Sequence, residues 1–257
     1  MKRLPRFAIG DGAAAAEIHG TVRVTGSELH HMRDVLRLDA GAEVLVYGPN
    51  GVKYTGRIAA FEPNAATIAV GEADPQQQES HCLILAVGMI KAVRMDLLIE
   101  KAAELNAAEF WPLKCTRSVV REPSLDRQER WRRISLAATK QSLRGRTMEI
   151  HEPIDVAAMI RGVPQTALAV TCIAGAEPLS SVIRRSADGL RVSPKAVVLA
   201  IGPEGDFTGE EVDLMCEAGF VMAGLGNSRL RSETAAIAAL SIAEGIFTEL
   251  ENSKPGA

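Results

Sequence analysis

The spacing of apolar and polar residues divides the chain into two parts with different patterns. Over the first 70 residues apolar and polar positions alternate in short runs, as in the segment 52–58 (VKYTGRI). Such alternation is typical of strands with one buried and one solvated face. We therefore predict a small antiparallel sheet or barrel, with strands over 42–47, 52–58 and 66–70. One short helix is expected over 26–38, which Ser27 could cap.

Beyond a polar stretch at 71–80 the pattern changes to long apolar runs that alternate with segments of helical period. Continuous apolar runs are typical of strands covered on both faces, and a 3.6-residue period indicates the covering helices. Repeated strand–helix units predict an α/β domain with a mostly parallel sheet. The expected strands are 82–90, 110–113, 167–173, 196–201 and 220–226, and the expected helices are 92–105, 125–143, 209–218 and 232–250.

These patterns predict four segments of chain. We expect a β-barrel domain at 1–72, a linker at 73–80, an α/β domain at 81–250 and a flexible tail at 251–257. Capping residues sharpen three helix boundaries. Asn106 lies where a helix end favours Gly or Asn. Thr208 and Glu211 have the spacing of a capping box, and Ser232 or Thr234 could cap the last helix.

Length and composition are those of an ordinary globular protein large enough for two domains. The chain has 257 residues, of which 47% are hydrophobic and 24% charged, and no apolar run approaches the roughly 18 residues of a membrane span. Asp11 and Glu17 interrupt any signal-peptide core, so we expect a cytoplasmic protein. The four cysteines are more than 30 residues apart, which fits neither a zinc site nor a redox pair. We expect free thiols and no metal.

Positive charge is concentrated in the middle of the chain. Between residues 113 and 146 there are ten Lys or Arg against three acids, a surplus of seven, although the whole chain has a formal net charge of −3. A local basic stretch is a candidate contact surface for a polyanion. A solvated helix face held by salt bridges is the alternative, and charge alone leaves both open.

Candidate ligand-binding loops follow three of the predicted strands. In parallel sheets ligands bind beyond the carboxyl ends of the strands, and loops leave such ends after Ile173, Ile201 and Leu225. The loop IGPEGDF (201–207) contains glycines, which allow close backbone approach to a ligand. It lacks the spacing of a dinucleotide-binding fingerprint.

The stretch LGNSRLRSETAA (225–236) places two arginines where a strand hands over to a helix. Glu233 in a first helical turn is favoured by the helix dipole, whereas Arg229 and Arg231 are disfavoured there unless an anion is near. That anion is either a bound ligand or an acid of the chain itself, and the residues leave both open.

Other basic residues suit contacts with RNA. The segment KQSLRGR (140–146) ends the predicted basic helix, and arginine is suited to bidentate phosphate contacts and to stacking on bases. His31 lies near Arg33 and Arg37 in the N-terminal part. The sequence offers no set of further metal ligands to complete a site with His31, so a surface or RNA-facing role is favoured over a metal site.

Taken in order, the motifs resemble those of the bacterial 16S ribosomal RNA (uracil-N3)-methyltransferases, a branch of the SPOUT superfamily. The resemblance runs nearly end to end. It is carried by RLPRF (3–7), HHMRDVLRL (30–38), GVKYTGRI (51–58), KAVRMDLLIEKAAEL (91–105), PLKCTRS (112–118), KQSLRGR, IGPEGDF and LRSETAA (230–236). It implies an RNA-binding PUA-like barrel followed by a SPOUT domain with a C-terminal trefoil knot. It also implies a homodimer that binds S-adenosylmethionine in the knot and methylates N3 of a uridine in 16S ribosomal RNA of the small subunit.

The resemblance further implies roles for individual residues. The cofactor would contact Cys172, Gly202, Pro203, Glu204, Gly205, Leu225, Gly226, Asn227, Leu230 and Ala235. RNA would contact Arg6, His31, Arg33, Arg37, Arg117, Gln141, Arg146 and Arg229. Catalysis would fall to Arg231, Glu233 and Arg144, the last from the partner subunit.

The chain departs from the family pattern at a few positions. Asp206 stands where the family usually has glycine, and Asn227 and Ser228 stand where it usually has Pro-Arg. The family motif Glu-Gln-x-Gly-Arg reads KQSLR here, so that Leu143 takes the place of its glycine. Two other functions are considered beside the main one. The first is a non-enzymatic RNA-binding or ribosome-associated protein, and the second is a SPOUT enzyme acting on a ribose 2′-oxygen or on transfer RNA.

Overall fold

The computed structural model describes residues 4–8, 20–47, 53–73, 81–118, 122–142, 146–189 and 195–252. Contacts along the chain define two compact units, Met1–Gln78 with Thr139–Thr147 and Glu79–Ala138 with Met148–Ala257. The segment KQSLRGR (140–146) therefore belongs to the first unit, although it lies far from it in sequence. Most of the predicted linker and of the predicted tail lies outside the described residues. In the described part of the chain, no helix is long and apolar enough to cross a membrane.

The first unit contains a five-stranded sheet in the order β1-β3-β4-β5-β2. The strands are β1 (Arg6–Ala8), β2 (Gly20–Val24), β3 (Glu43–Tyr47), β4 (Lys53–Glu62) and β5 (Ala65–Ala73). All pairs are antiparallel except β1 with β3. The three predicted strands are confirmed, with β4 and β5 longer than expected. β1 and β2 were not predicted.

The helix of the first unit differs from the prediction at its start. α1 (Gly26–His30) begins with Thr25 at the N-cap, and the cap makes no side-chain hydrogen bond. The predicted cap by Ser27 is wrong, since Ser27 lies inside the first turn. The chain continues as a π-helical turn, η1 (His31–Val35), which places Met32 in the core of the unit.

The second unit is built on a six-stranded sheet in the order β11-β9-β10-β6-β7-β8, in which every pair is parallel. The strands are β6 (Cys82–Gly88), β7 (Ala107–Leu113), β8 (Glu149–Ile150), β9 (Ala167–Cys172), β10 (Ala196–Ile201) and β11 (Val221–Ala223). The prediction of a parallel α/β domain is confirmed. The trefoil threading stays a prediction.

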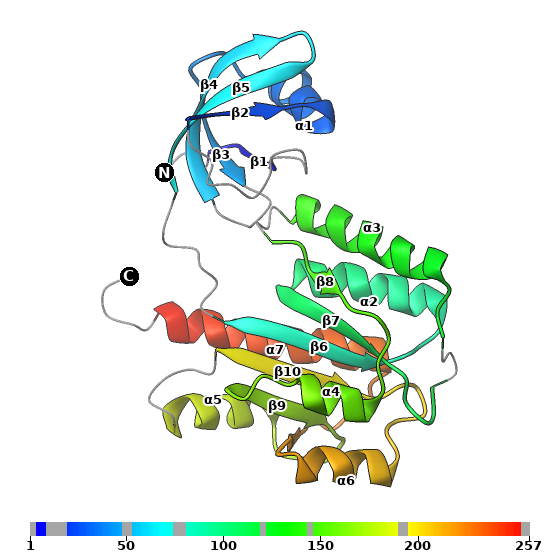
Figure 1. The fold of residues 1–257 in the computed structure, drawn as a ribbon. Helices are drawn as coiled ribbons and strands as arrows, with labels where there is room; N and C mark the ends of the chain where they lie inside the picture. The colour runs from blue at the N-terminus through cyan, green and yellow to red at the C-terminus, as the bar shows by residue number, and fades with distance from the viewer. Residues whose placement is uncertain are drawn as a thin grey trace. The chain divides into compact units, whose positions relative to one another are not determined.

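Helices cover both faces of this sheet. They are α2 (Ala92–Glu104), α3 (Leu125–Gln141), α4 (Val156–Gly162), α5 (Leu179–Gly189), α6 (Gly209–Glu217) and α7 (Ser232–Asn252). α7 runs behind β6 and β10, and α4 lies in front of the sheet (Figure 1). α4 and α5 were not predicted from the sequence.

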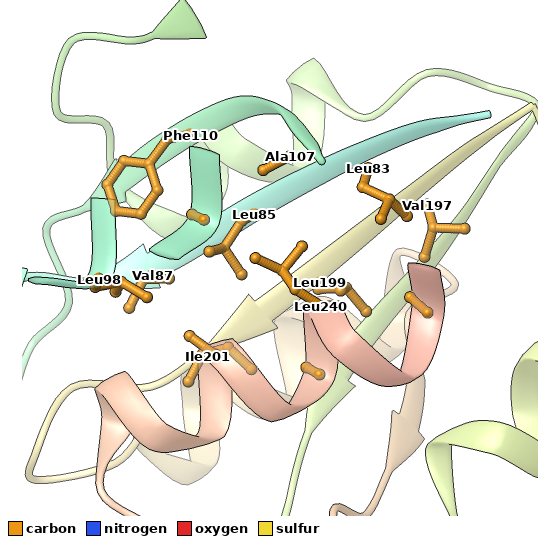
Figure 2. Packing of buried hydrophobic residues seen from close by; sticks show 14 of the residues in the cluster. Leu83, Leu85, Val87, Leu98, Ala107, Phe110, Val197, Leu199, Ile201 and Leu240 are labelled. Carbon is orange, nitrogen blue, oxygen red and sulfur yellow. The ribbon is translucent and has the colours of Figure 1, made fainter. Parts of the chain in front are cut away.

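The two central strands alternate their side chains between two separate cores. On β6, Leu83, Leu85 and Val87 enter the core shared with α2 and α7, as Figure 2 shows, whereas Ile84 and Ala86 enter the core on the opposite face. β10 alternates in the same way. Because both faces are covered, the strand needs no polar position, which is why its sequence is continuously apolar.

In the second unit, two of the three predicted caps are borne out. Asn106 follows α2 with φ +70°, a left-handed conformation that asparagine tolerates better than most residues. Thr208 and Glu211 form the predicted capping box of α6. α7 starts at Ser232, so neither Ser232 nor Thr234 occupies its N-cap. That position is held by Arg231, whose carbonyl accepts from the Ala235 amide at 2.8 Å.

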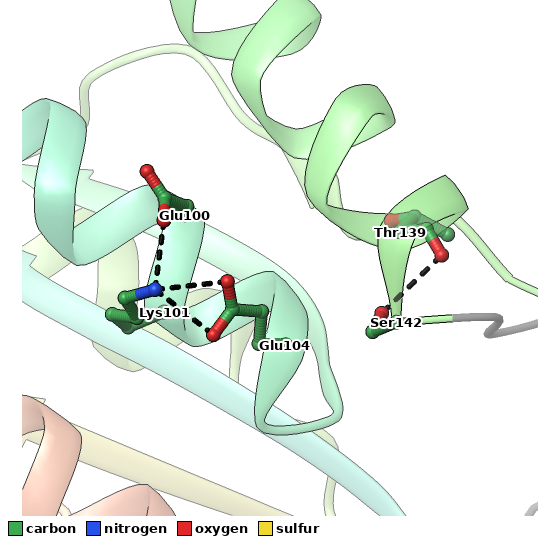
Figure 3. A network of polar contacts seen from close by, with 5 residues as sticks. All are labelled: Glu100, Lys101, Glu104, Thr139 and Ser142. Carbon is green, nitrogen blue, oxygen red and sulfur yellow. Dashed lines mark hydrogen bonds and ion pairs between the residues drawn. The ribbon is translucent and has the colours of Figure 1, made fainter.

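Two local polar contacts are shown in Figure 3. On α2, Lys101 donates to Glu100 at 2.7 Å and to Glu104 at 2.9 Å, and these carboxylates raise the pKa of the lysine. At the end of α3, the Ser142 hydroxyl donates to the Thr139 carbonyl at 3.2 Å. Each contact lies within one element or at its end, so neither fixes the tertiary arrangement.

A polar cluster ties α7 to the beginning of β6 and the end of α2. The Glu244 carboxylate accepts from the Asn106 amide at 3.0 Å and is 2.9 Å from His81 Nε2. His81 in turn stacks on Phe247, with ring centroids 4.5 Å apart. Because the histidine side chain is only 5% exposed, loss of its carboxylate partner leaves buried polar groups unsatisfied.

Replacing Glu244 by alanine is therefore expected to lower the free energy of unfolding by about 2–4 kcal/mol. Urea denaturation followed by circular dichroism measures this. Glu249→Ala on the same helix is the matched control, since Glu249 is 60% exposed and pairs with the exposed Arg184; a much smaller loss is expected there, because exposed ion pairs contribute little to stability. Equal losses in the two variants would contradict the structural role of the cluster.

Candidate active site at the strand ends

The three predicted ligand loops leave neighbouring strands at the same edge of the sheet. β11, β9, β10 and β6 are consecutive in the sheet and parallel, so their carboxyl ends lie together. The prediction that the loops after Ile173, Ile201 and Leu225 meet at one edge is confirmed. The end of β6, which the sequence analysis did not include, joins them.

The loops after β9 and β11 are held against each other by their backbones. The Gly224 amide donates to the Glu177 carbonyl at 2.6 Å, and the Leu179 amide donates to the Gly224 carbonyl at 2.9 Å. A Cβ on Gly224 would lie 2.5 Å from the Ala176 carbonyl oxygen. Only glycine permits this approach, so Gly224 sets the spacing of the two loops.

The loop after β10 packs equally closely on the end of β6. A Cβ on Gly88 would lie 2.5 Å from the backbone nitrogen of Pro203. Gly202 and Pro203 are themselves buried. Gly88 therefore allows the 202–205 loop to lie directly against β6, a contact that the sequence analysis did not foresee.

Arg117 and Asp206 stabilise the far side of this loop. Arg117 Nη1 donates to the carbonyls of Gly205 at 3.1 Å and of Phe207 at 3.3 Å. Asp206 adopts φ +64°, and its carboxylate accepts from the Phe207 amide at 2.9 Å. Aspartate can occupy the left-handed region because its side chain bonds locally, which explains how it replaces the glycine that the family usually has here. Arg117 thus holds the loop, while its predicted contact with RNA stays a prediction.

Glu211 links the loop after β7 to the same region. Its Oε1 accepts from the amide and hydroxyl of Thr116, at 2.8 and 3.1 Å, while its Oε2 accepts from the Thr208 amide at 2.9 Å. One carboxylate thus caps α6 and anchors the segment that carries Arg117. The loops after β7 and β10 form one hydrogen-bonded assembly.

Three charged side chains from three elements meet at this edge. Arg94, in the first turn of α2, places Nη1 3.3 Å from Glu204 Oε1 and Nε 3.5 Å from Glu233 Oε1. Among the described residues, the second oxygen of each glutamate is buried without a hydrogen-bond partner. The motifs IGPEGDF and LRSETAA are therefore joined by ion pairs to one arginine.

Arg94 was missed by the sequence analysis, although the rule that singled out Arg231 applies to it as well. Both are cations at a helix N-terminus, where the dipole disfavours them. For Arg94 the balancing anions are acids of the chain itself. For Arg231, which is exposed, no ion pair occurs among the described residues.

The remaining predicted cofactor residues lie along the same loops. Leu225 and Ala235 are partly buried and pack against the core, Leu230 is partly buried, and Gly226 and Asn227 are exposed. Gly226 has φ +113°, which favours glycine at this turn. Arg229 is exposed in the same segment.

All four cysteines are free, as the sequence predicted. Burial raises the pKa of Cys115 and of Cys172, the last residue of β9, to about 12. A thiol reacts as its thiolate, and a raised pKa keeps these two protonated at all pH values well below 12.

We expect Cys115 and Cys172 to be alkylated by iodoacetamide roughly 100- to 1,000-fold more slowly in the native protein than in urea, at about pH 8. Mass spectrometry of labelled peptides over time measures both rates. The rates in the native protein should rise as pH is raised towards the shifted pKa. Rapid labelling of Cys172 in the folded protein at neutral pH would contradict the burial of its thiol.

The predicted RNA-facing residues are concentrated in the first unit. They are Arg6, His31, Arg33, Arg37, Gln141 and Arg146, all within the residues that form that unit. All are exposed except Arg6, which is half-buried. Arg33 is bonded to the Pro63 carbonyl at 3.2 Å. Arg144 and Leu143 lie outside the described residues.

The basic helix α3 carries less unbalanced charge than its sequence indicates. Arg130 pairs with Asp96 at 2.8 Å, Arg132 with Glu152 at 2.9 Å, and Arg133 is 3.9 Å from Glu129. For these three arginines the structure agrees with the alternative of a salt-bridged helix face.

Comparison with known proteins places the chain in a family. The family model described as RNA methyltransferase domain matches residues 77–244, and that of the RNA methyltransferase PUA domain matches residues 24–70. The chain is 29% identical over 232 residues to ribosomal RNA small subunit methyltransferase E of Bacillus subtilis (86% of this chain, 88% of the relative). It is 30% identical over 229 residues to the protein of that name from Synechocystis (87% and 73%).

Solved structures agree with the sequence comparison. The crystal structure of ribosomal RNA small subunit methyltransferase E from Neisseria gonorrhoeae, bound to S-adenosyl methionine, aligns over 95% of this chain and 98% of its own, with a TM-score of 0.71 and 25% identity. Both units of the chain are covered by the two family models and by these relatives. The chain belongs to the RNA methyltransferase family, in the group of the ribosomal RNA small subunit methyltransferases E.

Proposed function

We propose that the protein transfers a methyl group from S-adenosylmethionine to N3 of a specific uridine in 16S ribosomal RNA of the small ribosomal subunit. The observation that supports this most directly is that Arg94 joins the two motif loops by ion pairs with Glu204 and with Glu233, which is two residues beyond Arg231. The names of the relatives and the cofactor in the Neisseria structure support the same reaction.

The residues at the strand ends fit S-adenosylmethionine. The buried, unpartnered oxygens of Glu204 and Glu233 call for hydrogen-bond donors, which the cofactor has in its amino and hydroxyl groups. Gly224 and Gly226 leave two positions of the adjoining loop without side chains. Leu225, Leu230 and Ala235 would provide the apolar contacts. When bound, the cofactor supplies a methyl group on a positively charged sulfur, and no metal is needed for that chemistry.

The difficult part of the reaction is the nucleophile. N3 of uracil carries a proton and becomes nucleophilic when it is lost, and the resulting negative charge spreads onto O2 and O4. Arg231 would stabilise that charge as it develops, and Glu233 would accept the proton or orient the base. The target base must also be unstacked to reach the site.

The first unit would bind the RNA, since most of the predicted RNA-facing residues belong to it. We further propose a cytoplasmic homodimer, in which Arg144 of the partner subunit would complete the site. Analytical ultracentrifugation tests the dimer, which should persist at micromolar protein concentration.

Mass spectrometry of nucleosides from small-subunit RNA treated with the protein and S-adenosylmethionine tests the reaction. Appearance of 3-methyluridine is the expected result. A 2′-O-methylated nucleoside, or methylation of transfer RNA alone, would assign the chain to a different activity. Absence of both product and cofactor-binding heat in calorimetry would instead favour a non-enzymatic RNA-binding protein.

A further inference from the structure

Arg94 occupies a position that is unfavourable for its own helix. It lies in the first turn of α2, which contains no acidic residue, and Lys91 at the N-cap makes no side-chain capping bond. The dipole of a helix disfavours a cation at this end. The charge of Arg94 is therefore balanced by other elements rather than by α2.

The negative charges that balance Arg94 come from two separate segments of the chain. Glu204 lies between β10 and α6, and Glu233 lies in the first turn of α7. The side chains of Arg94, Glu204 and Glu233 are 34%, 24% and 10% exposed. At this degree of burial, removing one member of an ion pair leaves an uncompensated charge that is costly. Without the arginine, two partly buried carboxylates would also repel each other.

Each of the two glutamates lies close in sequence to other predicted site residues. Glu204 follows Pro203, which packs on the end of β6, and Glu233 is two residues beyond Arg231. A planar guanidinium can contact two carboxylates in fixed directions, whereas an ammonium is a point charge. The arginine is thus suited to setting the relative position of the two loops.

We propose that Arg94 is a positioning residue of the methyltransferase site. By bridging Glu204 and Glu233, Arg94 holds the β10–α6 loop and the start of α7 in a fixed relative position. Arg231, which precedes α7, is thereby held at a fixed position relative to the β10–α6 loop, which is predicted to bind the cofactor. This inference rests on the proposed function, because the two loops matter for catalysis only if methyl transfer occurs at them.

Hydrogen–deuterium exchange tests the bridge without any substrate. In Arg94→Gln, amides in segments 202–208 and 226–233 should exchange about 10-fold faster or more, because local opening becomes easier. Arg184→Gln is the matched control, since it removes an arginine–glutamate pair between α5 and α7 and should leave both segments as in the wild type. Unchanged exchange in either segment of Arg94→Gln would overturn the proposal.

Single-turnover methyl transfer tests the consequence for the reaction. Arg94→Gln should be slowed about 10- to 100-fold, as for residues that orient a functional group through one contact. Arg94→Lys should recover part of the rate, because lysine restores the positive charge but not the planar guanidinium that contacts two carboxylates in fixed directions. In the double variant Arg94→Gln/Glu204→Gln the two losses should not multiply, since both remove the same bridge. A wild-type rate in Arg94→Gln, or fully multiplicative losses, would overturn the proposal.

The two hypotheses fail in different ways. If the wild-type chain transfers no methyl group to small-subunit RNA, the proposed function is refuted, while the exchange experiment still decides whether Arg94 joins the loops. If Arg94→Gln does not fold, Arg94→Lys decides: exchange faster than wild type in both segments supports the bridge, and wild-type exchange overturns it.

Discussion

The Arg231→Ala variant is expected to transfer methyl groups about 100- to 1,000-fold more slowly than the wild type, the range found when one donor to a developing oxyanion is removed. Its affinity for S-adenosylmethionine should be nearly unchanged. Arg231 is exposed at the N-cap of α7, and the described part of the chain gives it no acidic partner, so its charge is available to the uracil oxygens.

Single-turnover rates with saturating RNA and isothermal calorimetry with the cofactor separate these two effects. Arg231→Lys should retain part of the rate because it keeps a positive charge. Arg184→Ala, an arginine of α5 paired with Glu249, controls for loss of surface charge. Equal losses of rate and cofactor affinity in Arg231→Ala would show that this residue serves the cofactor rather than the base.

The Glu233→Gln variant is expected to lose about 100- to 10,000-fold in the single-turnover rate at neutral pH if the carboxylate accepts the N3 proton. The substitution keeps the shape of a side chain that is only 10% exposed. As pH is raised the loss should shrink, because hydroxide increasingly removes the proton that the carboxylate removes in the wild type.

The pH dependence separates a base from a positioning group. If Glu233 acts only through Arg94, its loss should be the same at every pH and should resemble that of Arg94→Gln. Glu249→Gln on the same helix, an exposed glutamate in an ion pair, should retain the wild-type rate. A full rate for Glu233→Gln at neutral pH would exclude the base role.

The pattern of apolar and polar residues was sufficient to predict the α/β domain, because its strands and helices depend on residues that are close in sequence. β10 was predicted without error at both ends, since AVVLAI is continuously apolar and is bounded by Lys195 on one side and by Gly202 and Pro203 on the other. The capping box of α6 and the end of α2 at Asn106 were also predicted correctly, as both depend on residues only a few positions apart. β1 and β2 were not predicted, and at the start of α7 the first helical residue was predicted correctly but the capping residue was not.

Several contacts of the site could not be predicted because they join residues that are distant in sequence. Gly88 and Pro203 are brought together by the pairing of β6 with β10. The Arg117 bonds to the 205–207 loop depend on the crossover from β7. The sequence left open whether Arg130, Arg132 and Arg133 are free or paired, and folding places acids of other elements, or of the preceding turn, beside them.

The sequence by itself determined the class of fold and the edge of the sheet at which the three candidate loops meet, because these follow from the period of the pattern and from the strand ends. Only the tertiary structure decided which charges neutralise each other. Arg94 and Arg231 are alike in sequence, each a cation at a helix N-terminus, yet one is bound by two glutamates of the chain and the other is exposed. Electrostatic pairing depends on distance in space, which no local pattern contains.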